Sequence, residues 1–165
     1  MRVRAFPARI GLSFVRCSSP MAHPELNALL DTLLPVAQML LRNHGEFYPF
    51  GAVMTSSGEI RHVGAKMEDD DHPPSQPLID LLTENFKKQA KRGELRAAGI
   101  CYDVLTVPPG EGQKCDAVCF SLEHYLGETV NVFVPYVKTA SGNIQYGEIF
   151  AAKRTGQFFC ELPSC

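Results

Sequence analysis

The sequence has no long apolar run, no strong charge excess of either sign and no common catalytic signature. Without about 18 consecutive apolar residues, it offers no membrane-spanning helix. Its 16 Lys and Arg against 18 Asp and Glu give a formal net charge of −2, which argues against a general nucleic-acid binder. The G-x-S-x-G, P-loop and dinucleotide-binding motifs are missing, so the sequence indicates no enzyme class and no cofactor.

Its 165 residues, of which 45% are hydrophobic, are enough for one domain with one core. The first 20 residues contain Arg2, Arg4, Arg9 and Arg16 but no acid. This composition is shared by transit peptides, by upstream extensions and by loose tails, whereas Pro7 interrupts the apolar stretch that a secretory signal needs. We expect residues 1–20 to be a loose tail or upstream extension, residues 21–152 a single domain, and residues 153–165 a C-terminal tail.

Two segments have the three- and four-residue apolar spacing of amphipathic helices. The first runs from Pro24 to about Asn43, with a proline suited to a first turn and Gly45 as its stop. The second runs from Ser75 to about Arg92 and ends before Gly93.

The rest of the chain predicts strands at residues 47–54, 59–66, 95–107, 115–126, 129–138 and 144–152, separated by turn sequences. Strands joined by tight turns pair antiparallel. We therefore predict an α+β domain of order α-β-β-α-β-β-β, with one possible extra strand, and one antiparallel sheet of five to six strands. The apolar stripes of the two helices can cover one sheet face, which gives two or three layers.

This element order, over residues 24–150, resembles the profilin-like group and in particular the roadblock and longin domains. In those domains a hairpin and a three-stranded meander form one five-stranded sheet. The stretches EFYPFGAVM, AAGICYDV and YGEIFA also resemble small bacterial proteins of unassigned function. Neither resemblance implies a catalytic residue.

The most concentrated group of polar residues is Glu68, Asp69, Asp70, Asp71 and His72. Carboxylates suit hard cations, but consecutive acids point in different directions and the pattern is not that of an EF-hand. We interpret this segment as a solvated acidic loop, with Asp69–Asp71 and His72 as a candidate surface for a partner and not as a metal site.

The cysteines most relevant to chemistry are Cys101, Cys115 and Cys119. Cys115 and Cys119 lie about 13 Å apart along one strand, too far to share a zinc ion. If the loop at 108–112 closes its hairpin symmetrically, Cys101 faces Cys119, within reach of a disulfide. Two interpretations stay open for this thiol pair, namely reduced core thiols and a redox pair or structural disulfide. A one-residue change of register would remove the pairing.

Aromatic residues gather in the last 40 positions, and we take Tyr146 and Phe150 as candidate contact residues for a partner. An apolar patch on an outer sheet face, or an open sheet edge, is typical of a protein-binding surface. We therefore expect a non-catalytic interaction module, either an adaptor or an immunity-type inhibitor, that binds a protein partner or forms a homodimer. The alternative is a small-molecule-binding or thiol-redox protein that uses Cys101 and Cys119. Since no secretory signal is visible, we expect a cytoplasmic location with reduced thiols.

Overall fold

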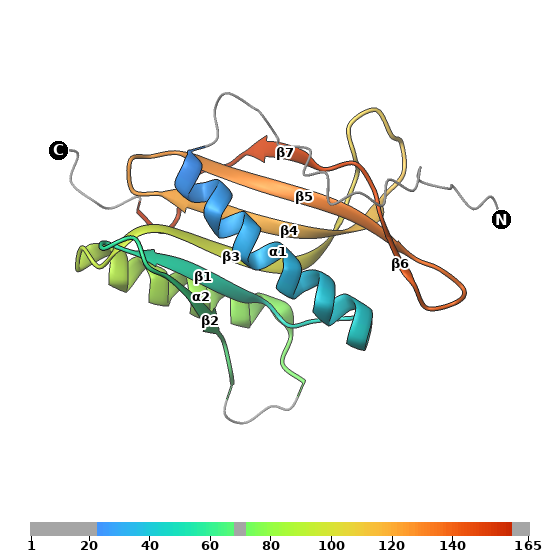
Figure 1. Ribbon diagram of the computed structural model, residues 1–165, viewed down its shortest axis with the longest axis horizontal. Coiled ribbons are helices and arrows are strands. Elements are labelled where there is room, and N and C mark those ends of the chain that lie inside the picture. The colour runs from blue at the N-terminus through green and yellow to red at the C-terminus, as the bar shows by residue number, and fades with distance from the viewer. Residues whose placement is uncertain (1–22, 68–71, 160–165) are drawn as a thin grey trace.

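The structure is a computed structural model that describes residues 23–67 and 72–159 (Figure 1). The expected tail at residues 1–20 and the acidic residues Asp69, Asp70 and Asp71 lie outside the described residues. Neither described helix is long and apolar enough to cross a membrane.

The two predicted helices are confirmed. Helix α1 spans Pro24–His44 and α2 spans Ser75–Lys91. In α1 one stripe is buried, consisting of Leu26, Leu29, Leu33, Ala37 and Leu41, and in α2 the buried stripe is Leu78, Leu82, Phe86 and Ala90. Each stripe repeats every three or four residues, so it lies along a single face of its helix. Gly45, with φ of +73°, ends α1 in the left-handed conformation that glycine adopts readily.

Within the described residues, seven antiparallel strands form one sheet, which confirms the predicted α+β class. They are β1 (Phe50–Thr55), β2 (Ile60–Gly64), β3 (Leu95–Thr106), β4 (Cys115–His124), β5 (Thr129–Lys138), β6 (Ile144–Tyr146) and β7 (Phe150–Lys153). The order across the sheet is β2-β1-β3-β4-β5-β6, and β7 also pairs with β5.

The predicted last strand, 144–152, is divided into β6 and β7, which pair with different parts of β5. Between them the Gly147 amide donates to the Pro135 carbonyl oxygen at 2.7 Å, outside the regular ladder. This division gives seven strands instead of the five or six expected.

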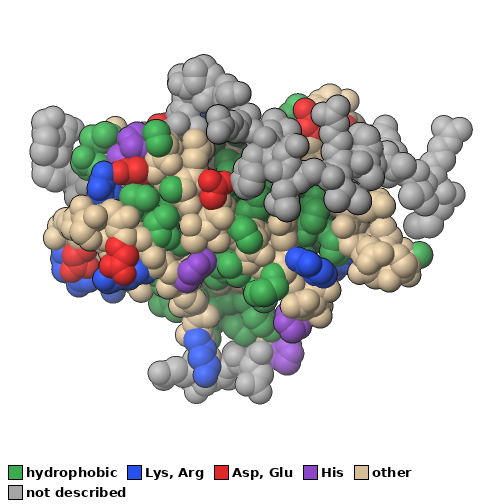
Figure 2. Space-filling model, in the orientation of Figure 1, with side chains coloured by type: hydrophobic (Ala, Val, Ile, Leu, Met, Phe, Trp, Pro, Cys, Tyr) green, Lys and Arg blue, Asp and Glu red, His purple; other side chains and the backbone are tan. Residues whose placement is uncertain are grey.

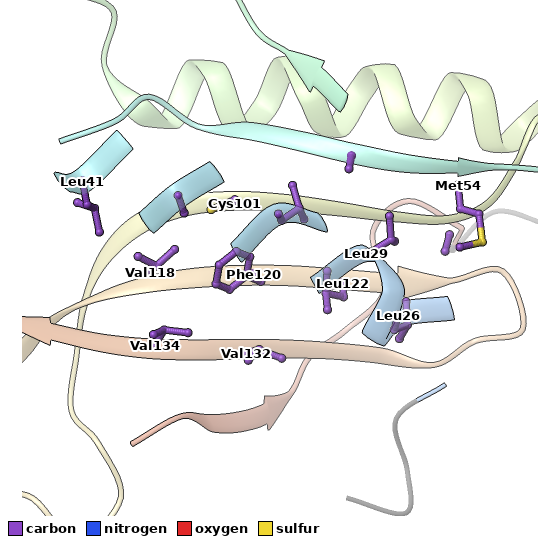
Figure 3. Packing of buried hydrophobic residues seen from close by; sticks show 14 of the residues in the cluster. Leu26, Leu29, Leu41, Met54, Cys101, Val118, Phe120, Leu122, Val132 and Val134 are labelled. Carbon is purple, nitrogen blue, oxygen red and sulfur yellow. The ribbon is translucent and has the colours of Figure 1, made fainter. Parts of the chain in front are cut away.

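The helices lie on opposite faces of the sheet, not together on one face, so the domain has three layers (Figure 1). On one side α1 packs against a core that includes Met54, Phe120 and Val132 (Figure 3). On the other side α2 packs against Val53 and Ile100. This is possible because β1 and β3 carry buried residues on both faces, as central strands between two layers do.

Residues 154–159, which we call the C-terminal strap, have no strand structure but are not a loose tail. Phe158 and Phe159 are buried in the core beside α2. The carboxylate of Glu123, only 1% exposed, accepts hydrogen bonds from the backbone amides of Gln157, Phe158 and Phe159 at 2.8–3.0 Å. The strap therefore closes the sheet face beside α2, where Phe158 and Phe159 are part of the core.

Candidate functional site

A group of interacting charged and polar side chains lies where α1 begins and the β4–β5 turn closes. We call it the turn-end cluster, and it consists of His23, Glu25, Arg96, His124 and Glu128. Glu25, in the first turn of α1, connects its members. One carboxylate oxygen accepts a hydrogen bond from the Arg96 guanidinium, and the other lies 2.6 Å from Nε2 of His124.

Arg96 reaches Glu25 because of an irregularity in β3. Thr55 pairs with Leu95, whereas Met54 pairs with Ala97, so Arg96 is the extra residue of a β-bulge. A bulge changes the face to which a side chain points and is common beside functional sites. Here it directs Arg96 toward α1, while Leu95 joins the core on the side of α2.

His124 is 1% exposed, and both of its ring nitrogens have partners. Nδ1 accepts a hydrogen bond from the Leu126 amide at 3.2 Å, and Nε2 faces the Glu25 carboxylate. A ring nitrogen that accepts a hydrogen bond carries no proton. His124 is therefore neutral in this arrangement, with its proton on Nε2 and donated to Glu25.

His23 joins the start of α1 to the turn. Its Nδ1 accepts from the Glu25 amide at 3.2 Å, which caps the helix, and its own amide donates to the Glu128 carboxylate at 3.0 Å. Its ring stacks on that of His124, with centroids 3.9 Å apart and ring planes inclined by 22°.

The environment of Glu25 favours its ionised form. Burial raises the pKa of this carboxyl group, whereas its hydrogen bond with His124 and the positive charge of Arg96 are the main causes that lower it, and the net shift is downward. The pKa of Glu25 is therefore lowered from its ordinary value of 4.5. Glu25 is a carboxylate at neutral pH and holds both partners by charge-assisted hydrogen bonds.

By residue type, the cluster resembles a zinc site, since His23, Glu25 and His124 offer ligand atoms within 4.8 Å of one another. The directions of the donors do not fit an ion, however. A metal lies in the plane of each imidazole that binds it, and two nearly parallel rings 3.9 Å apart cannot both meet this condition. In addition, binding at Nε2 of His124 would require a proton on Nδ1, which here accepts the Leu126 amide. As they lie, the described side chains of the cluster thus form a hydrogen-bonded network whose donor directions do not fit a metal ion.

The network supports an exposed turn. The amides of residues 124–127 all donate hydrogen bonds. The His124 amide donates to the Glu128 carbonyl oxygen and the Tyr125 amide to that of Arg96. The Leu126 and Gly127 amides both donate to His124, at Nδ1 and at the carbonyl oxygen. Residues 125–127, which we call the tip, present Tyr125 at 49% exposure and Leu126 at 68%. Two large apolar side chains therefore stand in solvent on a turn whose backbone is held throughout.

Two exposed ion pairs also lie at this end of the sheet. Arg61 lies 2.8 Å from Glu59, and Arg92 lies 2.8 Å from Glu94. Figure 2 shows acidic, basic and hydrophobic side chains intermixed at the left end of the molecule, where this turn lies in Figure 1. A concavity of about 270 Å³ between the β1–β2 turn and the end of α2 is smaller than the roughly 300–1,000 Å³ usual for ligand pockets.

The candidate residues predicted from the sequence lie elsewhere. His72 is exposed just before α2. Tyr146 is half-buried against the core beside α1, opposite Tyr136 in the ladder. Phe150 stacks on Phe133 at 4.9 Å on the other face of the sheet. The structure does not bring Tyr146 and Phe150 together on one surface, and neither is a largely exposed side chain.

The predicted facing of Cys101 and Cys119 is wrong by one position. Cys101 pairs with Phe120, and Cys119 pairs with Tyr102. Because side chains alternate between faces, the two thiols lie on opposite sides of the sheet, and both are buried free cysteines. Burial raises the pKa of both thiols above their ordinary value of 9.0, and that of Cys101 well above it.

Sequence reasoning missed the turn-end cluster because its contacts join residues 71 to 105 positions apart. One local signal was available, since His23-Pro24-Glu25 begins a helix and a polar residue before a helical proline is a natural cap. No sequence feature marks the bulge at Arg96.

No protein-family model, curated protein or solved structure matches the chain. The resemblance of its element order to roadblock and longin domains therefore stays a prediction.

Proposed function

We propose that this protein is a non-catalytic interaction module that binds a protein partner through the tip of the β4–β5 turn. The observation that carries the proposal is the exposure of Tyr125 and Leu126 on a turn whose amides are all hydrogen-bonded. Aromatic residues are enriched at the centres of protein interfaces, where they dominate binding energy.

Preorganisation supports this function. A partner that binds a mobile loop loses free energy by ordering it, at a cost of about 0.5–1.5 kcal/mol for each immobilised side chain, in addition to the backbone. The backbone amides of the tip are already held by Arg96 and His124. The formal net charge of −2 also favours a protein partner over nucleic acid, which is usually bound through an excess of cations.

The turn-end cluster itself is not arranged for catalysis. A general base needs a free basic nitrogen or oxygen within reach of a substrate proton. Nδ1 of His124 is taken by the Leu126 amide and that of His23 by the Glu25 amide, while Glu25 holds Arg96 and His124. Its polar groups serve the fold, which supports a binding role.

The partner is either another protein, as for an adaptor or an immunity-type inhibitor, or a second copy of this chain. We place this activity in the cytoplasm, where the described cysteines Cys101, Cys115 and Cys119 would stay reduced. The thiol-redox alternative has less support, because its two cysteines are on opposite sides of the sheet. Rapid titration of Cys101 and Cys119 in the folded protein would revive it.

The test compares the full chain with a double variant, Tyr125→Ser with Leu126→Ser, and with a control, Leu105→Ser. Leu105 is exposed to a similar degree, 63%, but lies in the half of β3 away from the tip. Light scattering measures self-association, and affinity capture measures retained proteins. We expect the wild type and the control to bind the same partner in equal amounts, and the double variant to lose it. Equal retention by all three proteins, or a strictly monomeric wild type without a partner, would contradict the proposal.

A further inference from the structure

We propose that His124 makes the tip sensitive to pH, so that protonation of its ring releases the Leu126 amide and loosens the surface presented to a partner. Only the consequence for binding rests on the proposed function, because the change in the tip is a property of the protein alone.

The inference starts from the two bonds of the His124 ring. Nε2 donates to Glu25 and Nδ1 accepts from Leu126. A second proton can bind only at Nδ1, since Nε2 already carries one. Nδ1–H and the Leu126 N–H would then be two donors facing each other at 3.2 Å, and they must separate. The tip is exposed, so the Leu126 amide can turn toward water instead.

Protonation does not disrupt the rest of the cluster. The groups that face His124 are the Glu25 carboxylate from α1, the His23 ring stacked at 3.9 Å and the neighbouring Tyr125 ring at 4.9 Å. Arg96 acts on His124 through Glu25, and the Glu128 carboxylate is held by the His23 amide. A charged His124 strengthens its pair with Glu25, so α1 stays attached while the tip is released.

This asymmetry separates a switch from simple acid unfolding. On protonation, the hydrogen bond from Nε2 to Glu25 becomes an ion pair. Nδ1 loses the hydrogen bond that holds the backbone of Leu126, whose apolar side chain is exposed. Imidazole side chains as a class change charge between about pH 5 and 8, which sets the range over which the response is sought.

The experiment is an NMR titration of the full-length wild type from pH 8 to pH 5. We expect the Leu126 amide signal to move in step with the ring protons of His124. After correction for the intrinsic pH dependence, hydrogen exchange at Leu126 should become about two- to tenfold faster, the change expected for one lost hydrogen bond. The amides of Leu26 and Asn27, which donate to the His23 carbonyl oxygen at the start of α1, should stay protected.

Two variants identify the responsible ring. His124→Gln can still donate to Glu25 but cannot titrate, so the Leu126 response should disappear. His23→Asn keeps a capping acceptor for the Glu25 amide but removes the stacked imidazole, so the response should remain.

Three results would overturn the inference. They are a His124 ring that stays neutral down to pH 5, a Leu126 amide that does not move while His124 titrates, and a response that persists in His124→Gln. These measurements need no partner. A failed switch therefore appears in the titration, whereas failure of the proposed function appears only in the capture experiment.

Discussion

Replacing Glu25 by Gln tests how strongly the turn-end cluster stabilises the fold. The substitution keeps the size and shape of the side chain but removes the charge that holds Arg96 and His124. A hydrogen bond to a charged group contributes about 1.5–3 kcal/mol. The amide oxygen of Gln can still accept from one partner, and the Arg96 side chain is partly exposed, which weakens its contribution. We therefore expect a loss of about 2 kcal/mol in the free energy of unfolding.

For a protein of this length, about 2 kcal/mol corresponds to a decrease in Tm of about 4–8 °C. Thermal and urea unfolding of both proteins measure the difference. Glu59→Gln is the matched control, because it makes the same chemical change in an exposed pair with Arg61 and should leave Tm unchanged. If Glu25→Gln and Glu59→Gln unfolded at the same temperature, the cluster would contribute nothing measurable and the reasoning would be refuted.

The same comparison has a pH dependence of known sign. The folded-state pKa of Glu25 lies below 4.5, so its ionised form stabilises the folded protein. For a given protonation state of His124, the difference between wild type and Glu25→Gln should be fully present above the unfolded-state pKa of the carboxyl group. It should be lost as the pH falls through the lower pKa of the folded state. A difference that grew with acidification below pH 4.5 would contradict the assignment.

Two further substitutions test the two sides of the sheet. Gly51→Ala would place a methyl carbon 2.6 Å from a backbone oxygen of β3. We therefore expect the free energy of unfolding, measured in urea, to fall by at least about 1–3 kcal/mol. Gly64→Ala is the control and should be tolerated, because no atom lies within 4 Å of its new carbon. Glu123→Gln removes the charge that holds the C-terminal strap, so we expect hydrogen exchange at the strap amides to become at least about tenfold faster while exchange in α1 is unchanged. Unchanged protection of the strap would mean that its two buried phenylalanines hold it without the carboxylate.

The helices and most strand positions could be predicted because they are local properties of the sequence. The buried stripe of α1 repeats every three or four residues, and Gly45 and Gly93 each follow a helix with φ near +70°. Strand β5 has the predicted bounds, because Gly127 forms a tight turn before it and Gly142 another after it.

The arrangement of these elements could not be predicted in the same way. In β1 and β3 both faces are apolar, so the alternation that would assign a face to each helix is absent. The β3–β4 connection is a loop of residues 107–114, and its geometry alone sets the register. The symmetrical closure assumed from the sequence was wrong by one residue, which moved Cys119 to the face away from Cys101.

The candidate site was the least predictable part, for a related reason. Glu25, Arg96 and His124 are unremarkable as single residues. They meet only because a bulge turns one side chain and the sheet places the end of β4 beside the start of α1. Site chemistry that depends on distant contacts leaves no spacing pattern in the sequence.

The division between β6 and β7 limits how copies of this protein can associate through their sheets. The β5 side ends in two separated runs of three and four residues, whereas β2 offers one continuous run of five. Short, interrupted edges are poor templates for another strand. Among the described strands, this leaves β2 as the one continuous margin at which another strand could pair.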